Sequence, residues 1–349
     1  MKICFIAELP EVQTGGAEIQ CYMLAKELAK RGYEIHYVSY REPPVIPETI
    51  NMHQVKIGNT ITSPIQHVTS LFKALNDANC DIYLETCPKL ATGLVALFCK
   101  TKKKAFVYRA ASLKDADLNF SQELGWPSVP WYFKVAYRFG IHNADVIVCN
   151  SVRVAEQFNQ LGKKTLVIPN GHHIEPLSRP PKKDDFILWV ARLTKIKRPE
   201  LVIRIAEALP KYKFVMVGKG NYKLPKLPDN VDFLGFKTGE ELKELYKRAS
   251  LLLITSLVEG FPNTLIEAGM YYTPCVSFYD PDDVIKNYRL GFSVSNVNQA
   301  IQAIKILMEN SSLRSEMGIN IRRYVEKNHN IEKTVKAYES LFRILLDKT

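Results

Sequence analysis

Long apolar segments are missing from this sequence of 349 residues. Its longest strongly apolar runs, Leu94–Cys99 and Leu251–Leu257, are far shorter than the roughly 18 residues of a membrane-spanning helix. The apolar run after Met1 is also too short for a signal peptide and instead predicts a buried strand. We therefore expect a cytoplasmic protein, with peripheral attachment to the inner face of a membrane left open.

Paired cysteines are also missing. The seven cysteines are scattered, and no two of them form a C-x-x-C pair. An odd number without such pairs argues against a disulfide framework and against a zinc site. His172 and His173 are adjacent, but no cysteine or histidine lies at ligand spacing from them. The sequence therefore predicts no metal site and no cofactor.

Acidic residues are outnumbered by basic residues, 36 to 47, which gives a net charge of +11. Residues 1–88 contain seven basic and ten acidic groups, whereas residues 89–140 contain nine basic and three acidic groups. The second segment also contains the aromatic residues Trp126, Trp131, Tyr132, Phe133, Tyr137 and Phe139. Two interpretations are open: solvated lysines beside an aromatic core helix, or a face that meets an anionic membrane or a phosphorylated acceptor. No nucleic-acid-binding motif accompanies the charge, so nucleic acid is not an expected partner.

Strand and helix patterns alternate along the chain. One example is the helical pattern Ala17–Arg31, which Gly32 follows as a C-terminal cap. Such repetition requires mostly parallel sheets that are covered by helices on both faces. A linker rich in proline at residues 169–185 separates two such halves, and the chain reads as helical from about Val297 to its end. The predicted fold class is α/β, with two doubly wound Rossmann-like domains at 1–170 and 171–329. A C-terminal helix at about 330–349 is expected to cross back to the first domain.

Two loops that follow predicted strands contain candidate phosphate-binding groups, because ligands of open α/β sheets bind beyond the carboxyl ends of the strands. Gly15 and Gly16 precede a helix and allow close approach of the backbone to a ligand. Arg192 and Lys197 lie five residues apart, directly after the predicted strand Phe186–Ala191. The planar fork of an arginine and the point charge of a lysine together suit a pyrophosphate, although a solvated basic loop would look the same.

A third loop follows the buried strand pattern Leu251–Thr255. Asn263 is expected to be the N-cap of the next helix, with Glu259 before it and Glu267 one turn into the helix. The amide groups between the two carboxylates can hold a phosphate, and the carboxylates can accept hydrogen bonds from sugar and ribose hydroxyls. Taken singly, Glu267 is a partner of the helix dipole and Glu259 a solvated acid. Taken with the two cations, they predict a nucleotide-sugar site.

The combination of these motifs resembles glycosyltransferase family 4, whose members are retaining enzymes of the GT-B fold that use nucleotide sugars. The resemblance rests on Glu259 and Glu267 as E-x7-E, Arg192 and Lys197 as R-x4-K, the Gly15-Gly16-x-Glu18 segment and the hinge Val167-Ile168-Pro169-Asn170-Gly171. It extends over almost the whole chain, with the motifs in the same order.

The resemblance implies roles for these residues. Arg192 and Lys197 would bind the donor diphosphate, Glu259 the transferred sugar and Glu267 the ribose. Residues 1–170 would form the acceptor side, and 171–329 the donor domain. The further donor-binding residues that it implies are Gly15, Gly16, Gly218, Phe236, Gly260, Phe261, Asn263 and Thr264.

The sequence departs from the family pattern at one place. Many family members carry a histidine near the sugar, after the fifth strand, where this chain has Tyr108-Arg109-Ala110-Ala111-Ser112. Arg109 is therefore a candidate contact of a phosphate or an acidic acceptor. Asp115 and Asp117 are candidates for assisting the acceptor hydroxyl.

The predicted function is that of a retaining, metal-independent hexosyltransferase, with Glu259, Arg192 and Lys197 as the catalytic residues. It would move a sugar from a UDP-, GDP- or ADP-sugar to a sugar or lipid-linked acceptor, in cell-surface polysaccharide, lipopolysaccharide or glycolipid synthesis. A nucleotide-sugar epimerase, a sugar phosphorylase and a non-catalytic nucleotide-sugar-binding subunit remain alternatives on the same fold.

A lipid-linked acceptor suggests a place for the basic and aromatic segment. Four lysines precede a predicted strand: Lys100, Lys102, Lys103 and Lys104. Trp126 lies before the next helix pattern, and Trp131 lies at its start. We expect these lysines and tryptophans on one exposed face, docked on the anionic cytoplasmic leaflet. The other interpretation is that the aromatic side chains are core and the lysines are solvated.

Overall fold

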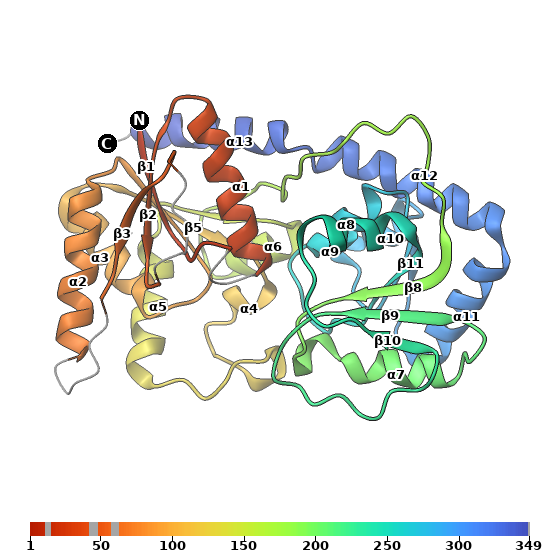
Figure 1. Cartoon of the computed structure of the whole chain (residues 1–349). Helices are drawn as coiled ribbons and strands as arrows, with labels where there is room; N and C mark the ends of the chain where they lie inside the picture. Colours follow the sequence, from red (N-terminus) through yellow and green to blue (C-terminus); the bar gives the residue numbers. More distant parts are fainter. Residues whose placement is uncertain (11–14, 42–47, 57–62, 348–349) are drawn as a thin grey trace. The chain divides into compact units, whose positions relative to one another are not determined.

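A computed structural model describes residues 1–10, 15–41, 48–56 and 63–347 of the chain. Their contacts define two compact units, Met1–Gly171 with Ile331–Thr349 and His172–Asn330. Each unit contains one parallel sheet with helices on both faces (Figure 1). The predicted fold class of two Rossmann-like domains is confirmed.

The sheet of the first unit has seven strands over the described residues, in the order β3-β2-β1-β4-β5-β6-β7. They are β1 (Lys2–Ile6), β2 (Glu34–Ser39), β3 (Asn51–Gln54), β4 (Ile82–Thr86), β5 (Ala105–Ala110), β6 (Val146–Cys149) and β7 (Thr165–Val167). The helices are α1 (Gly16–Lys30), α2 (Ser63–Ala78), α3 (Ala91–Lys102), α4 (Leu113–Ala116), α5 (Trp131–Asn143), α6 (Val152–Gln160) and α13 (Ile331–Leu346), with a 3-10 turn at Gln122–Leu124. Every pair of neighbouring strands is parallel, as the β-α alternation requires.

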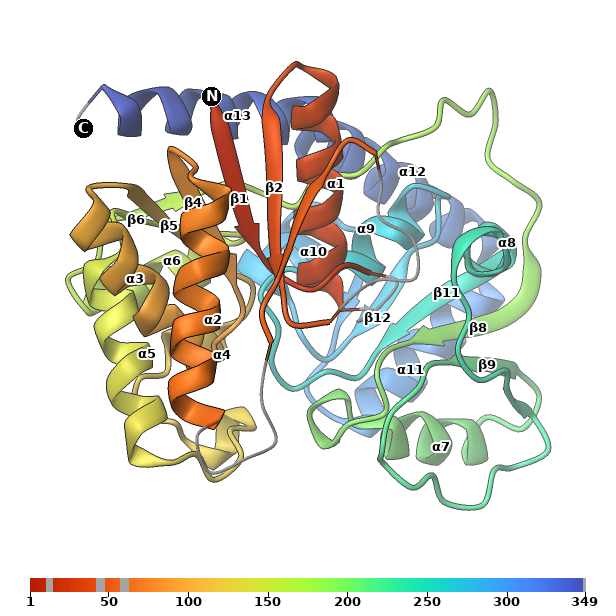
Figure 2. The same cartoon turned by 60° about the vertical axis from the view of Figure 1, so that its left-hand side comes forward.

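Helices α1 and α13 cover one face of the first sheet (Figure 2). Leu24 of α1 and Phe342 of α13 belong to the same buried cluster as Phe5 of β1. Arg31 donates to Glu339 across the two helices at 2.7 Å. Gly32, at a φ of +85°, ends α1 in the left-handed conformation that glycine adopts without strain, as predicted. The C-terminal helix is therefore part of the core of the first unit.

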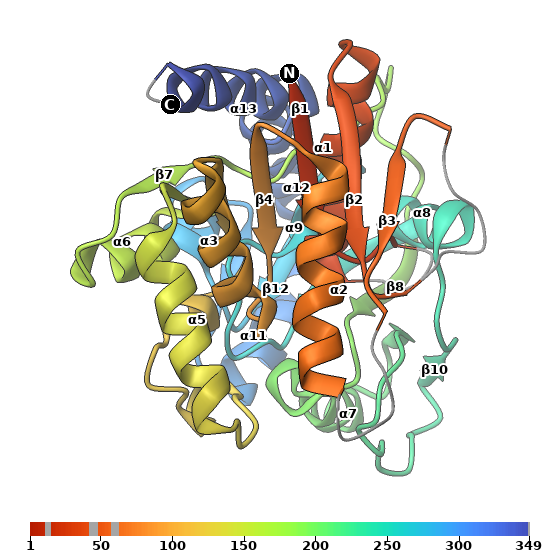
Figure 3. The same cartoon turned by 90° about the vertical axis from the view of Figure 1, so that its left-hand side faces the viewer.

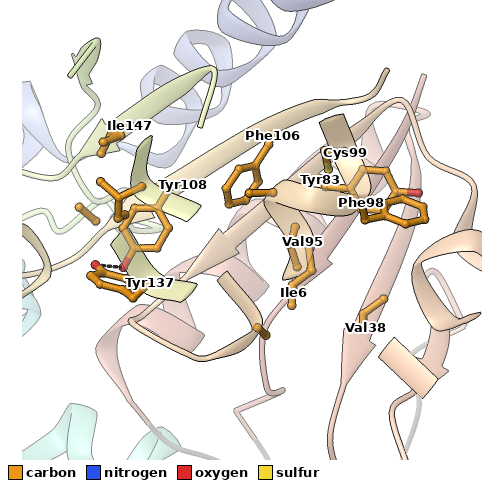
Figure 4. Close-up of a cluster of buried hydrophobic side chains, with 14 of the residues drawn as sticks. Ile6, Val38, Tyr83, Val95, Phe98, Cys99, Phe106, Tyr108, Tyr137 and Ile147 are labelled. Carbon is orange, nitrogen blue, oxygen red and sulfur yellow. Dashed lines mark hydrogen bonds between the residues drawn. The ribbon is translucent and has the colours of Figure 1, made fainter. Parts of the chain in front are cut away.

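Helices α2, α3, α5 and α6 cover the opposite face of this sheet, and the first three lie together in Figure 3. Figure 4 shows the buried cluster beneath them, in which Tyr83 and Phe98 pack edge to face with ring centroids 5.3 Å apart. The hydroxyls of Tyr108 and Tyr137 form a hydrogen bond of 2.9 Å. Pairing the two hydroxyls removes the cost of burying them in an apolar core.

The sheet of the second unit has six parallel strands, in the order β10-β9-β8-β11-β12-β13. They are β8 (Asp184–Val190), β9 (Lys213–Val217), β10 (Val231–Phe233), β11 (Ala249–Ile254), β12 (Cys275–Ser277) and β13 (Gly291–Ser293). The helices are α7 (Pro199–Glu207), α8 (Gly239–Arg248), α9 (Asn263–Gly269), α10 (Val284–Asn287), α11 (Val297–Glu309) and α12 (Ser311–Asn328), with 3-10 turns at Lys195–Lys197 and Pro281–Asp283. The sequence did not predict β13, which has only three residues.

Helices α7 and α11 cover one face of the second sheet, where Val202 and Ile304 pack in a cluster with Trp189. Helices α8, α9 and α12 cover the other face, where Ile266 and Ile321 belong to one cluster. All strands run the same way, so the loops after them gather at one edge of the sheet.

Candidate active site

The strand order of the second sheet reverses between β8 and β11. Strand β8 comes first in this unit, and the chain then builds β9 and β10 on one side of it and β11, β12 and β13 on the other. The carboxyl ends on either side of such a switch point are where open α/β sheets bind ligands. The loop after β8 carries Arg192 and Lys197, and the loop after β11 carries Glu259. The topology thus brings together two motifs that are far apart in the sequence.

Hydrogen bonds join these two loops. The N–H of Leu257 donates to the carbonyl of Ile196 at 2.8 Å, and the Thr255 hydroxyl donates to the carbonyl of Lys197 at 2.5 Å. The indole of Trp189 in turn donates to the Thr255 hydroxyl at 2.9 Å. The backbone that carries Lys197 is therefore held by the end of the neighbouring strand.

Arg198 also holds the two loops together. Its backbone is left-handed, with a φ of 49°, and its Nε donates to the carbonyl of Thr255 at 2.6 Å. The guanidinium lies 5.0 Å from the centre of the Phe278 ring. Because these contacts occupy its side chain, Arg198 is a structural cation rather than a candidate ligand contact.

Lys197 and Glu259 form an ion pair across the switch point, and the Lys197 Nζ donates to the Glu259 Oε1. Their side chains are 17% and 18% exposed, so both are within reach of a ligand and partly desolvated. The Tyr279 hydroxyl donates to the carbonyl of Glu259 at 3.0 Å and fixes its backbone. Arg192, on the same loop as Lys197, is exposed, and in the described part of the chain its side chain has no hydrogen-bond or ion-pair partner.

The sequence predicted Asn263 as the N-cap of α9, and this prediction is wrong. The helix begins at Asn263, Pro262 precedes it as the cap residue, and no side-chain capping bond is formed. The Asn263 side chain instead hydrogen bonds to His172, whose buried imidazole lies at the start of the unit. An asparagine caps a helix only when its side chain is free to bond the next turn, and here the histidine holds it.

Glu267 lies one turn further along α9, against Tyr246 of α8. Burial raises the pKa of its carboxyl, and the interaction with Tyr246 opposes that rise. Around it, Gly260 and Phe261 are buried, whereas Asn263 and Thr264 are half-buried.

Gly218 and Phe236 lie at the same edge of the second sheet, after β9 and β10. A Cβ on Gly218 would lie 1.9 Å from the carbonyl oxygen of Ala191, so only glycine fits there. The N–H of Gly218 donates to the carbonyl of Gly235 at 2.8 Å. The ring of Phe236 is exposed, with the Lys219 ammonium 4.0 Å from its centre. Gly218 thus has a packing role whether or not it meets a ligand.

In the first unit, Gly16 begins α1, and Gly15 is the residue before it. Thr14, the residue before these two glycines, lies outside the described residues. The N–H of Ile19 donates to the carbonyl of Gly15 at 3.0 Å, which starts the helical bonding.

Of the three candidate acceptor residues of the first unit, Arg109 and Asp115 are buried and Asp117 is half-buried. Arg109 is 4% exposed, and its Nη2 donates to the Asn170 Oδ1 at 2.6 Å. Asp115 is 3% exposed and accepts a hydrogen bond of 2.7 Å from the N–H of Ala111. Burial raises the pKa of Asp115 to about 6. Asp117 accepts from the N–H of Ser121 at 2.6 Å. Both aspartates therefore shape the loop after β5.

The basic and aromatic segment does not form one face, contrary to the sequence-based expectation. Trp126 is buried among Phe120, Phe133 and Tyr137, whereas Trp131 at the start of α5 is 75% exposed. The lysines lie at the other end of the helix pair, where the Lys100 Nζ donates to the Asn143 Oδ1 at 3.2 Å. At a rise of 1.5 Å per residue, Trp131 and Asn143 are about 18 Å apart along α5. Sequence proximity misled here because the next strand and loop lie between the lysines and Trp131.

Sequence reasoning missed two buried groups. Glu85, near the end of β4, is fully buried, and burial raises its pKa to about 8 against the opposing effects of Lys89 and Thr92. His172 was considered only as a metal ligand. Among the described residues, no group of three His, Cys, Asp or Glu side chains is placed to hold a metal ion. The only sequence feature that could have indicated a structural role for His172 was its position directly after the hinge.

Two family models match the chain. "Glycosyltransferase Family 4" matches residues 14–175, and "Glycosyl transferases group 1" matches residues 174–324. The chain belongs to glycosyltransferase family 4. It is a glycosyltransferase on a GT-B scaffold, and the family resemblance of the sequence motifs is confirmed.

Relatives and solved structures of similar length match this chain over nearly its whole length. One relative, from Campylobacter jejuni, is 24% identical over 351 residues, covering 92% of this chain and 93% of the relative. It is a GalNAc-alpha-(1->4)-GalNAc-alpha-(1->3)-diNAcBac-PP-undecaprenol alpha-1,4-N-acetyl-D-galactosaminyltransferase. Sucrose-phosphate synthase from Thermosynechococcus elongatus has a TM-score of 0.81 at 16% identity, covering 100% of both chains. Anabaena Alr3699/HepE in complex with UDP-glucose has a TM-score of 0.74 at 16% identity, covering 98% of this chain and 99% of that one. At these identities, the structures show the fold alone.

Helices that could span a membrane are absent from the described ranges, because none is both long and apolar enough.

Proposed function

We propose that this glycosyltransferase moves a hexose from a nucleoside-diphosphate sugar to an acceptor hydroxyl with retention of configuration. The observation that carries the proposal is the meeting of Lys197 with Glu259 at the switch point of the second sheet, beside the exposed Arg192. Two cations and a carboxylate at this edge suit a ligand that is anionic at one end and rich in hydroxyls at the other.

Each group has a role in this proposal. Arg192 and Lys197 bind the donor diphosphate and stabilise the charge that develops on it as the sugar leaves. Glu259 accepts hydrogen bonds from hydroxyls of the transferred sugar, and Glu267 from the ribose diol. The base lies toward Gly218 and Phe236, and the loop that carries Gly260, Phe261, Asn263 and Thr264 lines the diphosphate and sugar. Gly15 and Gly16 remain proposed donor-binding residues of the first unit.

The proposed reaction occurs on one face of the sugar. The bond between the anomeric carbon and the diphosphate oxygen breaks, and the acceptor oxygen forms a bond to the same carbon. The acceptor proton passes to the leaving diphosphate. In this proposal Glu259 meets the Lys197 ammonium and sugar hydroxyls, so no carboxylate acts as a covalent nucleophile. The fixed cations stabilise the leaving group, and the proposed reaction is metal-independent.

The proposed acceptor is a sugar on a lipid carrier, in cell-surface polysaccharide, lipopolysaccharide or glycolipid synthesis. The name of the Campylobacter relative describes a saccharide on undecaprenyl diphosphate, which supports this class of acceptor. Asp115 and Arg109 remain proposed acceptor-side residues of the first unit, with Asp117. Because Arg109 and Asp115 are buried, their proposed effect on the acceptor is exerted through the position of the loop after β5.

Ligand stabilisation tests the donor proposal. Thermal unfolding of the purified protein is followed with UDP, GDP, ADP and their hexose derivatives. A ligand at 100 times its Kd stabilises the folded state by about 2.7 kcal/mol. One nucleotide series is expected to raise the melting temperature, and NMR of the glycoside formed from its sugar is expected to show the donor's anomeric configuration. No shift with any of these ligands, or an inverted product, would contradict the proposal, and sugar isomerisation without an acceptor would indicate an epimerase.

The exposed face of α5 supports a second part of the proposal, which is peripheral attachment to an anionic membrane. Trp131, Val135 and Phe139 lie at i, i+4 and i+8 on one helical face and are 75%, 56% and 37% exposed. Tyr132 is exposed beside them, and Lys134 lies between them in sequence. Aromatic residues at headgroup depth with basic residues nearby are typical of interfacial helices.

Vesicle co-sedimentation tests this attachment. Binding to anionic but not neutral vesicles is expected, with loss of binding in the Trp131→Ser/Val135→Ser variant. The control is Lys102→Glu/Lys103→Glu, at the other end of the helix pair, which is expected to weaken binding less. Equal binding of wild type and the Trp131/Val135 variant, or no binding at low salt, would contradict the proposed face.

A further inference from the structure

The second unit begins and ends at the same place. The N–H of His172 donates to the carbonyl of His329 at 2.8 Å, and a parallel bridge joins His172 to Asn330. His172 and Asn330 are the first and last residues of this unit. The two chain segments that leave the unit are therefore bonded to each other at the point of exit.

The loop after β11 packs against the two ends of the unit, at His172 and His329. The buried ring of Phe261 lies 4.5 Å from the His329 ring, measured between centroids, and stacks on Tyr324 at 6.4 Å with an interplanar angle of 9°. The side chain of Asn263 hydrogen bonds to His172. Two residues of the loop that carries Glu259 thus contact the two ends of the unit.

His172 is a neutral donor at this place. Its burial and the nearby His329 lower its pKa to about 4, whereas the hydrogen bond to Asn263 favours the protonated ring and opposes that shift. A neutral imidazole has one N–H donor and one acceptor nitrogen. The bond to Asn263 therefore persists over the neutral pH range without burying a charge.

We propose that His172 is a positioning residue for the sugar donor: it holds Asn263, and with it the loop that carries Glu259, in the shape in which Glu259 meets Lys197. Between Glu259 and Asn263 the chain has no regular secondary structure, so its shape depends on side-chain anchors. The Tyr279 hydroxyl anchors one end of this stretch through the Glu259 carbonyl, and His172 anchors the other. The part of this inference that concerns donor binding rests on the proposed function.

The test compares three variants with the wild type. His172→Ala removes the donor to Asn263, His172→Gln keeps an N–H donor, and His173→Ala changes the neighbouring exposed histidine as a matched control. Hydrogen exchange of the backbone amides in residues 258–266 is measured without nucleotide. Steady-state kinetics then give separate KM values for donor and acceptor.

Faster exchange of residues 258–266 is expected in His172→Ala, with wild-type exchange in His172→Gln and His173→Ala. Loss of one hydrogen bond is expected to raise the donor KM of His172→Ala about threefold to tenfold, with the acceptor KM unchanged. A double-mutant cycle with Asn263→Ala is expected to show that the two substitutions are not additive.

Three results would overturn the inference. One is unchanged exchange of residues 258–266 in His172→Ala. Another is an equal rise in both KM values, which would show an effect that is not specific to the donor. The third is a fall in apparent kcat alone, which would indicate a loss of folded protein. A wild type that neither binds nor uses any nucleotide sugar would contradict the proposed function, whereas the exchange experiment would still report whether His172 holds the loop.

Discussion

The carboxyl edges of the two sheets use charged residues differently. At the edge of the second sheet, Lys197 and Glu259 pair with side chains that are 17% and 18% exposed, and Arg192 is exposed. At the edge of the first sheet, Arg109 and Asp115 are almost fully buried and bond to the surrounding loops. All five residues follow or end parallel strands, so topology alone does not separate them.

Side-chain exposure separates the residues that can bind a ligand from those that hold the fold together. A buried charged group needs internal partners, and once it has them it shapes the fold. A charged group that stays partly exposed at a switch point retains hydrogen-bonding capacity for a ligand. This difference is why we propose donor binding at the second edge.

The largest expected effect is at the exposed edge. Arg192→Ala and Lys197→Ala are each expected to lower turnover by about 10²–10³, the usual cost of removing one group that stabilises transition-state charge. Lys195→Ala is the control, because Lys195 is an exposed cation on the same loop. Turnover at saturating donor is measured alongside melting temperature. Near-wild-type turnover in Arg192→Ala or Lys197→Ala would remove that residue from the diphosphate site.

At the buried edge, substitution is expected to affect stability first. Arg109→Ala removes the hydrogen bond to the Asn170 oxygen and opens a cavity, which together cost about 2–4 kcal/mol of unfolding free energy. Urea denaturation measures the change, and Arg204→Ala, an exposed arginine on α7, is the control. If Arg109→Ala unfolded like the wild type but had a raised acceptor KM, the first edge would be a binding edge as well.

Glu267 is expected to have a smaller effect, on donor affinity alone. Glu267→Gln replaces a charged hydrogen bond to the ribose by a neutral one, and a charged bond is worth about 1.5–3 kcal/mol. Calorimetry is expected to show donor binding weakened by about one to two decades, with Glu207→Gln, an exposed glutamate of α7, as the control. Unchanged affinity of Glu267→Gln would show that the ribose lies elsewhere.

Glu85 gives an effect of another kind, which appears as a dependence of the unfolding free energy on pH. The folded pKa is about 8, whereas an ordinary glutamate has a pKa near 4.5, so between these values the folded state binds a proton that the unfolded state has released. Unfolding free energy is therefore lost as pH rises through this window, by about 1.4 kcal/mol per pH unit for one proton. Glu85→Gln is expected to gain stability relative to the wild type from pH 5 to 8. Parallel stability curves would show that Glu85 is ionised in the fold.

The sequence predicted most of the architecture, because its signals were local. The apolar face of α1 and the glycine after it come from residues within a few positions of one another. Strand β13 escaped prediction, since its sequence Gly291-Phe292-Ser293 contains only one large apolar side chain. The burial of Trp126 also escaped, because Trp126 lies in the loop before α5, where no periodicity separates a buried aromatic side chain from an exposed one.

The sequence predicted the residues of the site from local motifs, but it did not predict how they contact one another. The sequence identified Arg192, Lys197, Glu259 and Glu267 as motif residues, but the contact of Lys197 with Glu259 depends on the sheet order. Asn263 was predicted to be an N-cap because its competing partner, His172, is 91 positions away in the chain. Long-range contacts of this kind have no local sequence signal.

The switch point of the second sheet is the proposed binding place of the donor diphosphate. A crystal structure with the nucleoside diphosphate that stabilises the protein most, out of UDP, GDP and ADP, tests it most directly. We expect diphosphate oxygens within hydrogen-bonding distance of the Arg192 guanidinium and the Lys197 ammonium, with the ribose hydroxyls at Glu267. A diphosphate bound away from both cations would contradict it.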